Sequence, residues 1–260
     1  MATYRTPLRS LLSRKLDRLS QAKLEPVEVA VIDSGIDASH PDLQGRIVEA
    51  YAISTEEDGT VVISETSTKE NNDFLGHGTA VASIIAGVAP NARITDIRVL
   101  NAQNMCKGDV LLRGFGFAVE KEIKLLNMSL AASARYAPAL FELCEKAYRQ
   151  CQVVVASQKN LPIPDFGFPA EFSSCIAVGA ESYPDAYSVC YRMNRVIDFG
   201  AQGEQVKVAK AGGGYTEQTG ASFAAPTITG LTALLLGAQP DLRLFELKAM
   251  LKALAVQHVN

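Results

Sequence analysis

Short apolar runs alternate with helix-patterned segments along nearly the whole chain, and this alternation restricts the fold more than any other feature. The runs expected to be strands are 27–33, 61–63, 93–100, 123–130, 151–157, 175–179 and 205–209. The segments expected to be helices are 78–87, 109–121, 137–149, 222–237 and 241–255. Strands joined by crossover helices run parallel. We therefore predict an α/β fold: a doubly wound, mainly parallel sheet with helices on both faces.

The composition excludes several other classes of protein. Of the 260 residues, 48% are hydrophobic and 20% are charged, as in an ordinary globular domain. No apolar run reaches the roughly 18 residues that cross a bilayer, so we expect no membrane span. The formal net charge of −3 offers no concentrated positive charge, so we expect no nucleic-acid partner. The acidic stretch 54–73 is expected to be an exposed loop with a short edge strand.

The first 26 residues differ in character from the rest of the chain. Leucines recur there at helical spacing, and six basic residues against two acidic ones give the segment a charge of +4. We expect an amphipathic helix over residues 1–26, packed on a single domain that runs from 27 to 260. An Arg-rich segment of this kind is also typical of an organelle transit peptide, and that alternative stays open.

The cysteines bear on the compartment of the protein. There are five, at positions 106, 144, 151, 175 and 190, and none forms a CxxC pair. An odd number in a chain long enough to bury its own core argues against a disulfide framework. No apolar signal segment with a cleavage site is recognisable. Together these features favour a reducing compartment, so we expect a cytoplasmic protein.

Three polar residues stand where chemistry collects in such a sheet, just beyond a strand or at the start of a helix. Asp33 ends the first apolar run, His77 lies in Gly-His-Gly-Thr before an expected helix, and Ser222 opens a long apolar helix. Each has an ordinary explanation when taken alone, as a turn cap, a structural histidine and a helix cap, respectively. The other histidines, His40 and His258, lie in a turn and next to the C-terminus.

Taken together, the three residues support a chemistry that none supports alone. A serine hydroxyl is a weak nucleophile until a base removes its proton. Histidine does this near neutral pH, and a buried carboxylate fixes the histidine tautomer and stabilises the imidazolium. The set therefore predicts nucleophilic hydrolysis at Ser222. An esterase of the α/β-hydrolase class would show GxSxG and the order Ser…Asp…His, whereas this chain has Gly-Ala-Ser-Phe-Ala and the reverse order.

At these residues the sequence resembles the subtilisin family of serine peptidases. The segments that carry the resemblance are AVIDSGIDASHPDL (30–43), GHGTAVASIIAG (76–87) and GASFAAP (220–226), where the family usually has GTSMAxP. The resemblance covers nearly the whole domain. It implies a three-layer sandwich and a serine endopeptidase that acts on polypeptides, with Asp33, His77 and Ser222 as catalytic triad.

The resemblance also implies residues that bind the substrate. In VVVASQKN, Asn160 matches the family's oxyanion-stabilising Asn, but Lys159 stands where Gly is usual. Ser129, Leu130 and Ala131 match the segment that pairs with the substrate backbone and forms one wall of the pocket for the residue before the cut. Gly167 matches the pocket floor and is expected to leave depth there. An apolar residue before the scissile bond is therefore expected.

Two features of the family are missing from this sequence. Its tight calcium site uses a loop within the helix after the His motif, and here AGVAPNARI runs straight through. Asp42 matches one calcium ligand without its partners, so we expect no metal and no cofactor. Only 26 residues precede the first strand, too few for the family's prosequence, so the chain is expected to fold unaided or with a separate prosegment.

Two functions remain in competition. The first is an intracellular serine endopeptidase, with a dedicated precursor- or leader-processing protease as its narrower form. The second is an inactive or latent relative that binds peptides as a regulator. Lys159 and Ala131, both found where the family has Gly, are the residues that favour the second.

Overall fold

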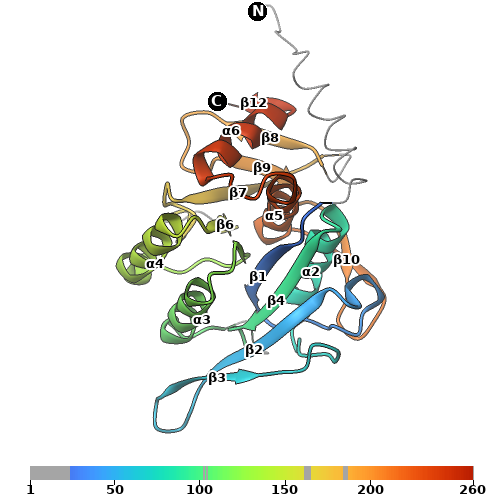
Figure 1. The fold of residues 1–260 in the computed structure, drawn as a ribbon, viewed down its shortest axis with the longest axis vertical. Coiled ribbons are helices and arrows are strands. Elements are labelled where there is room, and N and C mark those ends of the chain that lie inside the picture. The colour runs from blue at the N-terminus through green and yellow to red at the C-terminus, as the bar shows by residue number, and fades with distance from the viewer. Residues whose placement is uncertain (1–23, 102, 104, 161–164, 184–186, 260) are drawn as a thin grey trace, which may run out of the picture.

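The computed structural model describes residues 24–259 apart from 102, 104, 161–164 and 184–186. The helix expected over residues 1–26 lies almost wholly outside this part of the chain. Within the described residues, ten strands form the main sheet, in the spatial order β12-β8-β9-β7-β6-β5-β1-β4-β2-β3 (Figure 1). Their bounds are β1 Val27–Asp33, β2 Ile47–Thr55, β3 Val61–Glu65, β4 Ala92–Arg98, β5 Leu125–Met128, β6 Val153–Ser157, β7 Cys175–Glu181, β8 Val189–Arg192, β9 Phe199–Gln202 and β12 Gln257–Val259.

Neighbouring strands of this sheet are parallel except at two places. The pairs β2–β3 and β8–β9, both toward the edges of the sheet, are antiparallel. The strand predicted over 205–209 is β10 (Val206–Ala209), which pairs with β11 (Tyr215–Gln218) in a separate antiparallel hairpin. The prediction of a mainly parallel α/β sheet is confirmed, and the strand predicted over 205–209 is present but lies outside that sheet.

Helices cover both faces of the sheet (Figure 1). One face carries α2 (His77–Val88), α5 (Ala221–Ala238) and α6 (Leu244–Leu254), and the other carries α3 (Gly108–Glu120) and α4 (Ala137–Arg149). Strand β1 shows why two cores form. Its side chains alternate, so that Val29 and Val31 join the α2/α5/α6 core, while Ala30 and Ile32 join the α3/α4 core.

The helix α5 runs through the middle of the molecule. It is the one helix in the described part of the chain that is long and apolar enough to cross a membrane, and 89% of it is buried inside the protein. A helix that is apolar on every side belongs in the interior of a large domain, and α5 lies there, against α2 and six strands of the main sheet, β1, β4, β5, β6, β7 and β9. Its N-terminus carries Ser222 to the carboxyl ends of the parallel strands.

Candidate active site

The carboxyl ends of the parallel strands bring the three predicted residues together. Asp33 is the last residue of β1, His77 is the first residue of α2, and Ser222 is the second residue of α5. The helix α2 packs on both β1 and α5. In a parallel sheet, the segments that follow each strand all begin at the carboxyl ends of the strands. Residues far apart in the sequence can therefore meet at that edge of the sheet.

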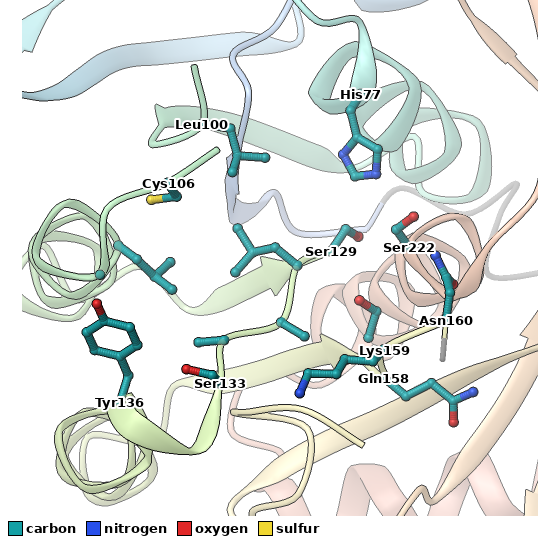
Figure 2. Close-up of a pocket in the computed structure, with 16 residues that line it drawn as sticks. His77, Leu100, Cys106, Ser129, Ser133, Tyr136, Gln158, Lys159, Asn160 and Ser222 are labelled. Atoms are coloured by element: carbon teal, nitrogen blue, oxygen red, sulfur yellow. The ribbon is translucent and has the colours of Figure 1, made fainter. Parts of the chain in front are cut away.

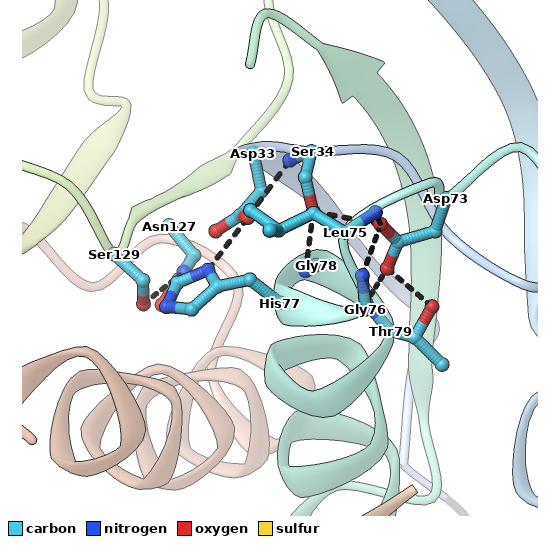
Figure 3. Close-up of polar contacts among 10 residues, drawn as sticks. All are labelled: Asp33, Ser34, Asp73, Leu75, Gly76, His77, Gly78, Thr79, Asn127 and Ser129. Atoms are coloured by element: carbon cyan, nitrogen blue, oxygen red, sulfur yellow. Dashed lines mark hydrogen bonds and ion pairs between the residues drawn. The ribbon is translucent and has the colours of Figure 1, made fainter. Parts of the chain in front are cut away.

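Asp33 and His77 form the shortest contact in this group. His77 Nδ1 lies 2.7 Å from Asp33 Oδ1 (Figure 3). Asp33 has no exposed surface, and its Oδ1 also accepts the backbone N–H of Ser34 at 2.8 Å. The ring of Phe223 lies 5.3 Å from the imidazole, centroid to centroid. A proton on Nδ1 donated to Asp33 leaves Nε2 as an acceptor.

The surroundings of His77 favour its protonated form. Burial opposes ionisation of the ring, but the charge and hydrogen bond of Asp33, together with the charge of Asp73, outweigh burial. The pKa of His77 therefore lies above its ordinary value.

Asp73 is a residue of this site that the sequence analysis missed. It was expected in an exposed loop, yet it is only 3% exposed. Its Oδ1 accepts the Ser34 hydroxyl at 2.9 Å and the Gly76 N–H at 2.7 Å, and its Oδ2 accepts the Thr79 N–H at 2.9 Å (Figure 3). An acidic residue a few positions before a helix can satisfy the free N–H groups of the first turn, and that signal could have identified it.

Ser34 completes the link between β1 and α2. Its hydroxyl donates to Asp73 and accepts the N–H of Gly78 at 2.9 Å. Close approach of the two elements requires Gly78, because a Cβ there would lie 2.2 Å from the carbonyl oxygen of Gly35. Ser34 and Gly78, the residues that follow Asp33 and His77, thus hold the end of β1 close to the start of α2.

Ser222 and His77 face one cavity of about 520 Å³ (Figure 2). Both belong to the described part of the chain, and no hydrogen bond joins them in this structure. Contacts of this kind are often loose in the free enzyme and tighten when substrate binds. Besides these two residues, the lining consists of Leu100, Cys106, Gly108, Leu111, Ser129, Leu130, Ala131, Ala132, Ser133, Tyr136, Ser157, Gln158, Lys159 and Asn160.

Asn160 points its amide at the start of α5. Its Oδ1 accepts the backbone N–H of Ala221 at 2.9 Å, which leaves the Nδ2 hydrogens as the donors on the side of Ser222 (Figure 2). Gly220 allows this approach, with φ of 154° and an added Cβ only 3.2 Å from Asn160 Oδ1. Asn160 therefore stands next to Ser222 although Lys159 precedes it.

The segment expected to form one cavity wall lies at the end of β5. The Ser129 hydroxyl accepts from Asn127 at 3.0 Å, and Asn127 accepts from Thr229 of α5 at 2.7 Å. This buried chain ties the wall to the helix that carries Ser222. The backbone of Leu130 and Ala131 makes no hydrogen bond to another described residue, while Ala132 pairs with Phe168 in both directions.

The depth expected at Gly167 is absent. A Cβ on Gly167 would lie 2.7 Å from the Ala131 Cβ and 2.9 Å from the Lys159 Cγ, so these side chains already occupy the space above it. The Lys159 ammonium forms an ion pair with Asp165. The expectation was wrong because the aliphatic part of the Lys159 side chain fills the space that a glycine at position 167 was expected to leave open.

No group of three or more His, Cys, Asp or Glu residues suited to a metal ion occurs in the described ranges. Asp42, which matches a calcium ligand of the family, accepts the Tyr215 hydroxyl at 2.8 Å instead.

The mainly parallel sheet with helices on both faces defines a three-layer α/β sandwich. The sequence model of the subtilase family, Peptidase_S8, matches residues 25–259, and the chain belongs to this family. It is a serine-type endopeptidase of the subtilisin kind, and its substrate is a polypeptide.

Similar proteins include bacterial peptidases and a solved structure. The chain is 32% identical to an intracellular serine protease of Paenibacillus polymyxa, over 83% of this chain and 68% of the relative. It is 31% identical to the major intracellular serine protease of Bacillus subtilis (strain 168), over 80% and 68%. The crystal structure of a cold-adapted subtilisin-like serine proteinase matches with a TM-score of 0.71 at 25% identity, covering 88% of this chain and 82% of that one.

Proposed function

We propose that Ser222 is the nucleophile of this endopeptidase, His77 its general base and acid, and Asp33 the residue that orients His77. Ser222 Oγ attacks the carbonyl carbon of the scissile bond while His77 Nε2 takes the hydroxyl proton. The same proton then passes to the leaving amine, which gives an acyl-enzyme that water hydrolyses. The contact of 2.7 Å between Asp33 and His77 is the observation that carries this proposal.

The negative oxygen of the tetrahedral intermediate needs donors. We propose the Ser222 N–H and the Asn160 Nδ2, since Asn160 Oδ1 is already taken by Ala221. The N-terminus of α5 adds the partial positive charge of a helix dipole. An extended peptide can pair with the unpaired backbone of Leu130 and Ala131, as an added strand pairs with a sheet edge.

A fluorophosphonate probe tests the nucleophile directly. We expect labelling of the wild-type protein at Ser222, located by mass spectrometry, and none in Ser222→Ala. The Ser222→Ala variant must keep its unfolding temperature, which shows that the loss is chemical rather than structural. A folded wild-type protein that neither takes the label nor cleaves casein would favour the alternative of an inactive peptide-binding relative.

We propose further that the protein works inside the cell as a processing protease. Two similar proteins are named intracellular serine proteases. The described cysteines are all free thiols, although the sulfurs of Cys144 and Cys175 lie 3.5 Å apart. Comparison of new protein termini in cells with the wild-type and the Ser222→Ala protein tests this role. A few cleaved precursors are expected, and broad degradation would contradict it.

A further inference from the structure

We propose that Lys159 limits the substrate residue before the scissile bond to a small, uncharged side chain such as Gly, Ala or Ser. The proposal rests on the proposed function, because it takes Ser222 and Asn160 to hold the reacting carbonyl group. That carbonyl lies between the two residues, and the side chain one bond away must enter the nearest part of the cavity. Lys159 precedes Asn160 in the chain and lines the same cavity as Ala131 (Figure 2).

Lys159 and Ala131 leave little room at this point. The position of a Cβ on Gly167 lies 2.7 Å from the Ala131 Cβ, 2.9 Å from the Lys159 Cγ and 3.3 Å from the Lys159 Cε. Three segments that come from different parts of the fold therefore meet over Gly167, and the lysine stem fills the gap between them. A long side chain of the substrate would have to displace this stem.

The stem is held at both ends. The backbone N–H of Lys159 donates to the carbonyl of Phe166 at 2.7 Å. Its ammonium pairs with Asp165, and the two side chains are only 25% and 16% exposed. Breaking an ion pair that is partly removed from water leaves an unpaired carboxylate, which is unfavourable. The lysine is thus a fixed part of the wall rather than a flexible surface chain.

The same ion pair argues against selection of an acidic substrate residue. Lys159 would be the cation to attract such a residue, but Asp165 already neutralises it. A substrate carboxylate would compete with Asp165 and be repelled by it. Size, rather than charge, is therefore the property that Lys159 selects.

The test is a panel of peptides that differ only at the residue before the cleaved bond, with Gly, Ala, Leu, Phe or Glu. For the wild-type enzyme we expect kcat/KM for Ala to exceed that for Phe by at least tenfold. In Lys159→Ala this ratio should fall at least tenfold, through a rise in kcat/KM for Phe. In Lys159→Met, which keeps the length of the stem without its charge, the ratio should stay within threefold of the wild type.

A matched control is Lys121→Ala, which removes another partly exposed lysine, paired with Glu49 at 2.9 Å and absent from the cavity lining. It should leave the ratio unchanged. The proposal is overturned if the wild type prefers Phe, Leu or Glu, if Lys159→Ala keeps the wild-type ratio, or if Lys159→Met behaves like Lys159→Ala. Fluorophosphonate labelling distinguishes failure of this inference from failure of the proposed function. If the enzyme is labelled but Lys159→Ala keeps the wild-type ratio of kcat/KM for Ala and Phe, only this inference is refuted. If the protein neither takes the label nor cleaves peptides, the proposed function is refuted as well.

Discussion

Three buried carboxylates whose charges act on one another make different contacts. Asp33 contacts the imidazole, Asp73 holds the start of α2, and Asp96 accepts the backbone N–H of Ile36 at 3.0 Å. Burial, reinforced by the neighbouring charges of Asp73 and Asp33, raises the pKa of Asp96 to about 8. Because Asp96 is then mainly protonated at neutral pH, it adds little negative charge beside Asp33 and Asp73.

The raised pKa of His77 predicts the pH dependence of activity. Only the neutral ring can accept the Ser222 proton, so kcat/KM should rise with pH. Its midpoint should lie above about 6.5, the ordinary value for histidine. Asp73→Asn should lower that midpoint, because it removes a charge that favours imidazolium. A purely structural role for Asp73 would lower the plateau of the profile and leave the midpoint in place.

The raised pKa of Asp96 predicts that the stability of the fold decreases as the pH rises. Its folded-state pKa of about 8 lies far above the value of about 3.9 in an unfolded chain. Between these values the unfolded state loses the proton first, so stability falls as pH rises. The free energy of unfolding of Asp96→Asn, minus that of the wild type, should therefore grow from pH 4 to 8 and then level off. A difference that stays constant in urea titrations across this range would contradict the assignment.

Among secondary-structure elements, the contact between α2 and α5 matters most, because these helices carry His77 and Ser222. They approach closely at Gly230, where an added Cβ would lie 2.5 Å from the Cβ of Val88. The sequence has small residues after both His77 and Ser222, and in the structure such residues allow α2 and α5 to pack closely. Their packing keeps two helix N-termini at one edge of the sheet.

Gly230→Ala should therefore lower stability and activity together. Overpacking of this kind costs about 1–3 kcal/mol. Gly87→Ala is the matched control in α2, since an added Cβ there meets no atom within 4 Å beyond its chain neighbours and the nearby backbone of its own helix. That variant should be neutral or more stable by about 0.5–1 kcal/mol, because it removes chain entropy from the unfolded state. Equal melting temperatures for the two variants would show that the helices do not depend on this contact.

For the whole molecule, resistance to chelation is expected from the sequence, because AGVAPNARI runs straight through where the family's tight calcium site has a loop. An ion that binds only the folded protein adds to its stability, and its removal lowers the melting temperature. Treatment with EDTA should shift that temperature by no more than about two degrees. A larger fall, reversed by calcium but not by magnesium, would reveal a site that this account lacks.

Much of the fold could be predicted because each buried strand and helix has a local pattern. The runs 27–33 and 151–157 are apolar on both faces, and the five described helices lie within a few residues of their predicted bounds. Strand β2 was missed because it is only partly buried and mixes polar with apolar residues. Strand β10 was predicted, but its partner β11 was not, because pairing partners are set by tertiary structure.

The site was predictable where a motif fixes the residues, and not where it depends on packing. Asp33, His77, Ser222 and Asn160 could be proposed from their motifs. The filled space over Gly167 could not, since it depends on where the stem of Lys159 lies relative to a wall 28 positions earlier in the chain. The burial of Asp73 was missed because its acidic neighbours suggested an exposed loop, although its position just before α2 could have identified it.

The central claim is that Asp33, His77 and Ser222 act as one unit. The most direct measurement is kcat of His77→Ala, of Ser222→Ala and of the double variant, each confirmed to be folded. We expect each single change to lower kcat by about a millionfold and the double change to lower it no further, magnitudes carried over from subtilisin itself. A single variant that keeps more than a tenth of the activity, or a double variant whose loss is the product of the two, would contradict the claim.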